Sequence, residues 1–128
     1  AAKSIKPEIE VIGAEPSGAD DAFRSLQEKK LIPSVNPQTM ADGLLTSLGE
    51  LTFKAISEFT NEILTVSESA IVEAMKLLFE RMKLVIEPSG CVPLAAVLEH
   101  PAKFRSQRTG IILSGGNLDL SALYSFYS

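Results

Sequence analysis

The chain has too few cysteine and histidine side chains for several common kinds of site. Its 128 residues include one cysteine, one histidine and no tryptophan. Cys91 cannot form a disulfide within the chain, which agrees with a reducing compartment, and a Cys/His zinc site would lack ligands. His100 is the only imidazole, and no spacing places it beside a serine nucleophile. We expect Cys91 to be inert packing and His100 to cap a helix end at the surface.

The chain also lacks a dominant charge and a long hydrophobic run. The formal net charge is −4, and the 12 lysines and arginines are scattered along the sequence. A nucleic-acid partner is therefore not expected. No apolar run approaches the roughly 20 residues that cross a bilayer, and the N-terminus lacks the order of a signal peptide. These features predict a cytoplasmic protein without membrane contact, and residues 1–128 are expected to form one domain.

Short strands and helices are predicted to alternate along the chain. Strands are expected at residues 8–14, 63–66 and 110–113, where β-branched side chains gather. Helices are expected at residues 19–30, from Leu48 to Phe59, from an N-cap at Ser67 to Lys83, from Pro88 to about His100, and at residues 118–127. This order predicts an α/β fold with an open, largely parallel sheet flanked by helices.

Two of the predicted helices have regularly spaced apolar residues. The first face consists of Leu48, Leu51, Ala55, Ile56 and Phe59, and the second of Ile71, Met75, Leu78 and Met82. Steps of three and four residues are typical of an amphipathic helix, so the methionines are expected to pack in a core. The helix after Pro88 is apolar on most sides and is expected to be buried.

The segment Gly110–Asn117 gives the clearest local signal of a ligand site. In an open α/β sheet a ligand lies outside the carboxyl ends of the strands, which is where Ser114 would stand. The serine hydroxyl can donate to a ring nitrogen or a phosphate, and Gly115 and Gly116 would let the backbone approach a ligand. An ordinary strand-to-helix turn agrees with the spacing equally well.

Carboxylates supply two further candidates. Glu15, Asp20 and Asp21 stand together where a strand is expected to lead into a helix, and such oxygen atoms suit Mg²⁺ or Ca²⁺. On spacing alone, helix capping by the aspartates with a solvated Glu15 is the favoured alternative. Glu87 directly precedes a predicted helix start and follows apolar residues, so it should be paired, either in a binding site or in a structural ion pair.

Five motifs in a fixed order resemble those of the serine racemases and their threonine dehydratase relatives, which are fold-type II pyridoxal-phosphate enzymes. They are Val11–Asp21, Thr39–Gly43, Ile63–Glu68, Glu80–Gly90 and Ile112–Asp119. The resemblance covers nearly the whole chain. It implies that the chain is the C-terminal part of the large domain of a tryptophan synthase beta-like fold.

The resemblance also implies what these motifs bind. Ser114 would bond the pyridine nitrogen of pyridoxal phosphate, with Gly115 beside it and Glu87 near the cofactor ring. A serine, unlike an aspartate, leaves that nitrogen largely unprotonated, which weakens the ring as an electron sink.

Two more binding sites are implied by the same resemblance. Mg²⁺ or Ca²⁺ would be held by the carboxylates of Glu15 and Asp21 and the backbone carbonyl of Ala19. Lys83 and Asn117 match nucleotide-site positions at a dimer interface, so ATP is expected as an effector. The parent enzyme would be a homodimer that interconverts L- and D-serine and dehydrates serine to pyruvate and ammonia.

The family's catalytic groups are expected to precede Ala1. They include the Schiff-base lysine, the opposing serine and the phosphate-binding glycines, so no catalytic residue is expected in this segment and the isolated chain is predicted to be inactive. A threonine or 3-hydroxyaspartate ammonia-lyase segment stays open, as does a non-catalytic truncated product that pairs with a full-length subunit. A self-standing ligand module is disfavoured, because a parallel sheet cut from its first strands leaves an unpaired edge.

Overall fold

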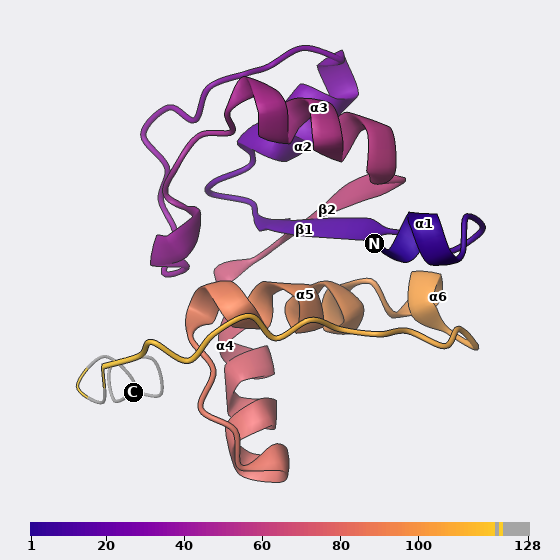
Figure 1. The fold of residues 1–128 in the computed structure, drawn as a ribbon. Helices are drawn as coiled ribbons and strands as arrows, with labels where there is room; N and C mark the ends of the chain where they lie inside the picture. Colours follow the sequence, from indigo (N-terminus) through magenta and orange to yellow (C-terminus); the bar gives the residue numbers. More distant parts are fainter. Residues whose placement is uncertain (120, 122–128) are drawn as a thin grey trace.

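The computed structural model describes residues 1–119 and 121, and two parallel strands divide it into two helical layers (Figure 1). Strand β1 (Ile12–Pro16) pairs with β2 (Glu62–Val66), with Ile12 opposite Glu62 and Pro16 opposite Val66. The two helices α2 and α3 lie on one side of the strands and form the upper layer of Figure 1, while α4, α5 and α6 form the lower layer. The α/β class and the parallel pairing agree with the sequence-based prediction.

The helices are short and follow the order that the sequence predicts. Their bounds are α1 Ala2–Ile5, α2 Asp21–Glu28, η1 Asp42–Leu44, α3 Glu50–Phe59, α4 Glu68–Leu77, the π-helical turn η2 Leu78–Met82, α5 Pro88–Glu99 and α6 Pro101–Phe104. The upper layer and η1 belong to the crossover that joins the two parallel strands. None of the described helices combines the length and the apolar content that crossing a membrane requires.

The hydrophobic core lies in the lower layer, where α4 packs on α5 against the strands. Its most completely buried members are Ala41, Val66, Ile71, Ala74, Leu78, Cys91, Val92 and Ala95. The start of α4 is fixed by Ser67, whose hydroxyl accepts a hydrogen bond from the amide of Ala70 at 3.2 Å. The predicted N-cap and the predicted burial of α5 are both confirmed.

The predicted burial of Met82 is wrong. Ile71, Met75 and Leu78 are buried as expected, but Met82 is 59% exposed. The backbone widens into a π-helical turn at Leu78–Met82, and Lys83 then adopts a left-handed φ of 60°. These changes end the regular helical spacing and turn the last methionine away from the core.

The apolar face predicted for the helix at Leu48–Phe59 is also wrong in part. No residue of α3 is buried, and Leu51 is 86% exposed. Ile56 of the predicted face is half-buried, as is Leu48 before the helix, but Ala55 and Phe59 are exposed and Phe53 is half-buried without having been predicted. Spacing alone therefore identified the helix and part of its covered side, but not the whole of it.

The strand predicted at residues 110–113 does not form within the described part of the chain. Ile112 is 79% exposed, and the segment runs along α5 without joining the sheet (Figure 1). A strand needs a neighbour that takes up its backbone hydrogen bonds, and the strands described here, β1 and β2, pair with each other. The helix predicted at residues 118–127 falls largely outside the described residues.

Candidate functional site

The segment before α5 crosses the glycine-rich segment near the C-terminus. The backbone N–H of Glu87 donates to the carbonyl of Gly115 at 3.1 Å. A Cβ atom at Gly115 would overlap Oε1 of Glu87, and one at Gly116 would lie 2.6 Å from the carbonyl oxygen of Val85. Glycine is thus required at Gly116, where the obstacle is backbone, whereas a side chain at Gly115 would have to displace the Glu87 carboxylate.

This crossing brings the three predicted cofactor residues together. Ser114 adjoins Gly115 and is exposed, while Glu87 is half-buried. The bond between the backbones of Glu87 and Gly115 therefore brings the segment that carries the exposed Ser114 against the segment that carries Glu87. A hydroxyl donor and a carboxylate acceptor on two such segments suit a polar aromatic ring, which is the chemistry predicted for this position.

Two residues without a predicted role lie close to the same crossing. The amide of Gly43, in η1, donates to Oγ of Ser89 at 3.2 Å, and Ser89 is the second residue of α5. The Thr39–Gly43 motif was part of the family resemblance, but it suggested no site residue. The two partners are 46 residues apart, so no local sequence pattern could have revealed their contact.

The predicted metal site begins with Glu15 at the end of β1. Its two carboxylate oxygens accept hydrogen bonds from the amides of Ala22 at 3.2 Å and Phe23 at 2.8 Å. Burial raises the pKa of Glu15 to about 7, and the nearby charges of Asp21 and Asp20 add to the rise, although the two amide bonds oppose it. Glu15 thus caps α2 and is not solvated, contrary to the favoured alternative.

The two aspartates have different surroundings. Asp21 is only 3% exposed, and its Oδ2 accepts a hydrogen bond from the amide of Leu48 at 3.1 Å. Asp20 forms an ion pair with Arg24, with Oδ1 and Nε 2.8 Å apart, and its side chain does not cap α2. Helix capping by the aspartate pair is therefore wrong as an explanation of this cluster.

The remaining predicted metal ligand, the carbonyl of Ala19, lies in the turn between Glu15 and Asp21. The amide of Phe23 donates to the carboxylate of Glu15. The first turn of α2 therefore does not use this amide for a hydrogen bond to the carbonyl of Ala19. Over the residues that the structure describes, no group of three or more Asp, Glu, His or Cys side chains could hold a metal ion. A cation at this turn would therefore need backbone or water oxygens in addition to the carboxylates.

The predicted nucleotide residues are both exposed. Lys83 follows the π-helical turn, and its Nζ donates to the carbonyl of Glu80 at 2.7 Å. Asn117 follows Gly116, which would touch Val85 if it carried a Cβ atom. The two residues therefore flank the crossing of the segments on which Glu87 and Gly115 lie.

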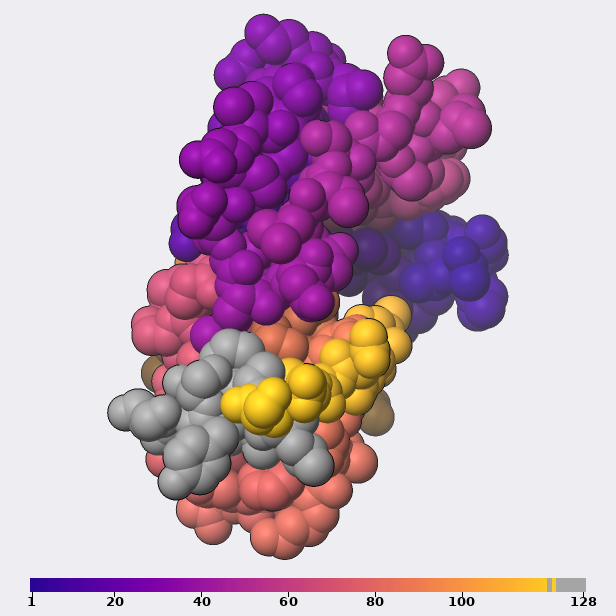
Figure 2. Space-filling model, turned by 90° about the vertical axis from the view of Figure 1, so that its left-hand side faces the viewer, coloured from indigo at the N-terminus to yellow at the C-terminus, as the bar shows by residue number. Residues whose placement is uncertain are grey.

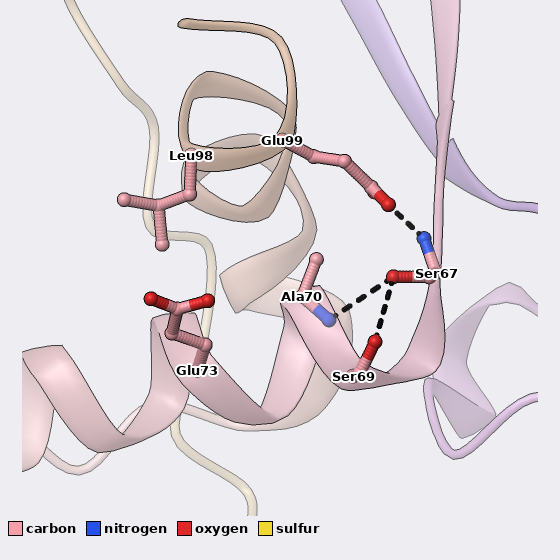
Figure 3. A pocket seen from close by; sticks show the side chains of 6 residues that line it. All are labelled: Ser67, Ser69, Ala70, Glu73, Leu98 and Glu99. Carbon is pink, nitrogen blue, oxygen red and sulfur yellow. Dashed lines mark hydrogen bonds between the residues drawn. The ribbon is translucent and has the colours of Figure 1, made fainter.

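A shallow depression of about 160 Å³ lies away from these residues (Figure 3). It is lined by Ser67, Ser69, Ala70, Glu73, Leu98 and Glu99. Its polar groups largely bond one another, since Glu99 accepts from the amide of Ser67 at 2.9 Å and the two serine hydroxyls are 3.0 Å apart. These contacts join the start of α4 to the end of α5, so the depression is explained by packing.

The surroundings of Cys91 agree with the role predicted for it. Cys91 is fully buried, and burial raises the pKa of its thiol to about 12, with the charge of Glu87 adding to the rise. Its predicted inert role is confirmed by this environment.

His100 is half-buried, and its Nε2 lies 3.1 Å from the carbonyl oxygen of Thr65. His100 is the C-cap residue of α5, as predicted, but its side chain does not lie free at the surface, because the imidazole links the end of α5 to β2.

Comparisons with known proteins identify the class to which this fold and this crossing of segments belong. The model of the family described as pyridoxal-phosphate dependent enzymes matches residues 1–115. The chain belongs to that family, and its fold is that of the tryptophan synthase beta-like members. The predicted family resemblance is thereby confirmed.

Several relatives resemble the chain over nearly all of its length. Identity is 45% both to a beta-hydroxyaspartate dehydratase of Paracoccus denitrificans, over 94% of this chain and 38% of the relative, and to a serine racemase of Arabidopsis thaliana, over 99% and 40%. The structure of maize serine racemase matches with a TM-score of 0.89 and 42% identity, over 99% of this chain and 40% of that one. The chain spans about two fifths of the length of these relatives.

Proposed function

We propose that the chain is the C-terminal part of a serine racemase that also dehydrates serine to pyruvate and ammonia. The observation that carries the proposal is the backbone contact between Glu87 and Gly115, which joins the segments of Glu87 and the exposed Ser114 in a chain of the pyridoxal-phosphate family. Residues 1–128 would form one partial domain of a homodimeric, cytoplasmic parent. Serine would be the amino-acid substrate.

The residues at the crossing fit pyridoxal phosphate. The Glu87 carboxylate lies against Gly115, the residue after Ser114, and the absence of a side chain at Gly115 leaves it that place. Bound pyridoxal phosphate supplies an electron sink for the bonds at the substrate Cα atom. The hydroxyl of Ser114 would donate a hydrogen bond to the pyridine nitrogen, and Glu87 would lie near the ring. Because the serine hydroxyl is a weak acid, the nitrogen would stay largely unprotonated.

The turn before α2 fits a hard divalent cation. Glu15 and Asp21 would supply carboxylate oxygens and Ala19 a carbonyl oxygen to Mg²⁺ or Ca²⁺. The raised pKa of Glu15 supports this assignment, because a cation would favour the ionised form that burial and neighbouring charges disfavour. The cation would have a structural role, joining the end of β1 to the start of α2.

The assignment of ATP as an effector rests on Lys83 and Asn117. Both side chains are exposed next to the crossing that would hold the cofactor. A nucleotide bound there would contact the same two segments. Its effect on activity would therefore pass through the backbone around Glu87 and Gly115.

The first experiment adds pyridoxal phosphate to the purified chain, with and without Mg²⁺, and follows absorbance, borohydride reduction and peptide mass. We expect no stoichiometric reduced adduct on any of the lysines, since the lysine of the family is expected upstream of this segment. Amide chemical shifts near Ser114 and Glu87 should change on binding, and Ser114→Ala should abolish the changes whereas Ser69→Ala should not. A stoichiometric lysine adduct would contradict the predicted inactivity.

A hydroxyaspartate ammonia-lyase is the second candidate, because the Paracoccus dehydratase is as similar to the chain as the Arabidopsis serine racemase.

The sequence encoded upstream of Ala1 separates these candidates from a truncated product. An upstream frame with a cofactor lysine and phosphate-binding glycines would exclude the truncated product. The complete enzyme should then be assayed for pyruvate from serine, oxaloacetate from 3-hydroxyaspartate and 2-oxobutyrate from threonine.

A further inference from the structure

Glu68 has an unusual environment at the start of α4. Its Oε2 accepts a hydrogen bond from the backbone amide of Met40 at 2.8 Å, across 28 residues of sequence. Its Oε1 is buried and has no hydrogen-bond partner among the described residues. Leaving a carboxylate oxygen buried without a donor is unfavourable, whereas a bond from an amide to a charged group is strong. The fold therefore keeps an unfavourably buried carboxylate oxygen at Glu68 together with a single hydrogen bond to the backbone of Met40.

The contact fixes one end of a loop whose other end lies at α5. Ala41 is fully buried in the core directly after Met40, and its amide donates to Oγ1 of Thr39 at 3.1 Å. Two residues further on, the amide of Gly43 donates to Oγ of Ser89 at 3.2 Å and also to Oδ1 of its neighbour Asp42 at 2.9 Å. The segment Thr39–Leu44 is thus held by α4 at Met40 and by α5 at Gly43.

The far end of this loop is next to the proposed cofactor site. Ser89 follows Glu87 by two residues in the first turn of α5, and Glu87 contacts Gly115. A Cβ atom at Gly43 would lie 2.8 Å from Oγ of Ser89, so the loop backbone has little freedom there. A shift of the loop at Met40 would therefore move Gly43 relative to the start of α5.

We propose that Glu68 is a positioning residue that holds the Thr39–Leu44 loop, and through it Gly43, against the start of α5 beside the cofactor site. The functional meaning of this role rests on the proposed function, but the positioning itself does not. Glu68 would touch neither cofactor nor substrate.

The test compares two variants of nearly equal size in the whole chain, with amide hydrogen exchange measured by NMR and no cofactor added. Glu68→Gln can still accept from Met40, whereas Glu68→Met cannot, and both remove the charge. Both variants carry Asp42→Ala, so that the hydroxyl of Ser89 is the remaining side-chain acceptor for the amide of Gly43. In this background we expect Glu68→Met to speed exchange at Met40 and Gly43 by about tenfold or more, and Glu68→Gln to stay within about threefold of the parent. The amide of Val11, which donates to Oδ1 of Asn61 at 2.9 Å, is the unaffected reference.

Faster exchange at Met40 without a change at Gly43 in Glu68→Met would overturn the positioning role. Equal effects of the Gln and Met variants would do the same, since only one of them loses the bond. Ser89→Ala gives a second test that does not depend on the Met variant folding. In the same Asp42→Ala background it should speed exchange at Gly43 and leave Met40 protected, and loss of protection at Met40 would mean that α5 holds the loop.

The same variants separate this inference from the cofactor proposal. If pyridoxal phosphate causes no shift near Ser114 while Glu68→Met still releases Gly43, the cofactor proposal fails and the positioning role stands. If pyridoxal phosphate changes the chemical shifts near Ser114 but exchange at Gly43 is the same in Glu68→Met and in the parent, only the positioning role fails.

Discussion

The two layers that cover the sheet are stabilised by different kinds of contact. In the lower layer, α4, η2 and α5 pack side chains such as Ile71, Leu78 and Val92, each at most 2% exposed. In the upper layer, α3 has no buried residue, and the fully buried side chain of α2 with the largest volume is Ser25, whose hydroxyl accepts from the amide of Ile32 at 2.9 Å. Figure 1 shows the strands between these layers, and Figure 2 shows the surface from the side.

The comparison separates two sources of stability within one small fold. Apolar burial, which dominates the lower layer, is independent of pH and scales with the area removed from water. The upper layer depends on polar contacts. Among them are the hydrogen bonds that Asp21 accepts from the amide of Leu48 and that Glu15 accepts from the start of α2. Mutations should therefore be most costly in the lower layer, whereas pH and cations should act mainly on the upper one.

The largest expected effect comes from Ile71→Ala. Ile71 is completely buried between α4 and α5, so the cavity should lower the free energy of unfolding by about 3 kcal/mol. Leu51→Ala on α3 is the matched change at an 86% exposed position and should cost less than about 0.5 kcal/mol. Urea unfolding followed by circular dichroism measures both. Similar losses for the two variants would mean that α3 has a partner that these contacts do not include.

The same contrast explains which parts of the fold could be predicted. The lower layer combined a strong N-cap, Ser67, with a regular apolar face, and both features are local in sequence. In α3 the spacing identified a helix but only part of the side that is covered, because burial depends on a partner elsewhere in the fold. The strand expected at 110–113 failed for a related reason, since apolar β-branched residues indicate a strand only where a neighbour offers backbone partners.

The candidate site was predictable where its residues are close in sequence. Glu15, Ala19 and Asp21 lie within one strand-to-helix turn, and the structure keeps them there. Their chemistry was less predictable, because the capping role passed from the aspartates to Glu15. Contacts between distant segments, such as Gly43 with Ser89, have no signature in composition or spacing. Only the fold brings them together.

The second prediction concerns pH. The carboxyl of Glu15 has an ordinary pKa of 4.5 when exposed and about 7 in the folded chain, so the folded state binds its proton more tightly. The contribution of Glu15 to the free energy of unfolding is therefore greatest below pH 4.5 and is lost as pH rises to about 7. After allowance for its partial exposure, we expect a loss of about 1–2 kcal/mol over this range.

Glu15→Gln is the control for this pH effect, since it keeps an oxygen acceptor but cannot ionise. The stability of the parent should fall between pH 5 and pH 7, whereas that of the variant should lack this fall, and urea midpoints at several pH values would measure both. Added Ca²⁺ or Mg²⁺ should restore stability at pH 7.5 more than at pH 5, and only in the parent. A pH profile unchanged by the substitution would assign the effect to another carboxylate.

The third prediction concerns the cap of the lower layer. Ser67→Ala removes the hydroxyl that accepts the amide of Ala70, so α4 should lose about 1 kcal/mol of stability. Ser69→Ala is the matched control, because its hydroxyl contacts only Ser67 and is not needed for the helix start. Thermal unfolding of both variants gives the comparison. An equal loss for the control would indicate that the serine pair, and not the cap, is the stabilising unit.

The smallest expected effect is a gain in the upper layer. Helix α3 starts at Gly49, which has no side-chain acceptor, and Thr52 Oγ1 accepts from its amide at 3.0 Å. The φ of −88° and ψ of 165° at Gly49 suit a serine N-cap, and a Cβ atom there would lie 3.5 Å from Thr52 Oγ1, an ordinary contact distance. Gly49→Ser should therefore add about 0.3 kcal/mol, whereas Gly49→Ala should add nothing. Urea midpoints of the two variants distinguish these results, and a loss in the serine variant would mean that the hydroxyl of Thr52 already satisfies the helix start.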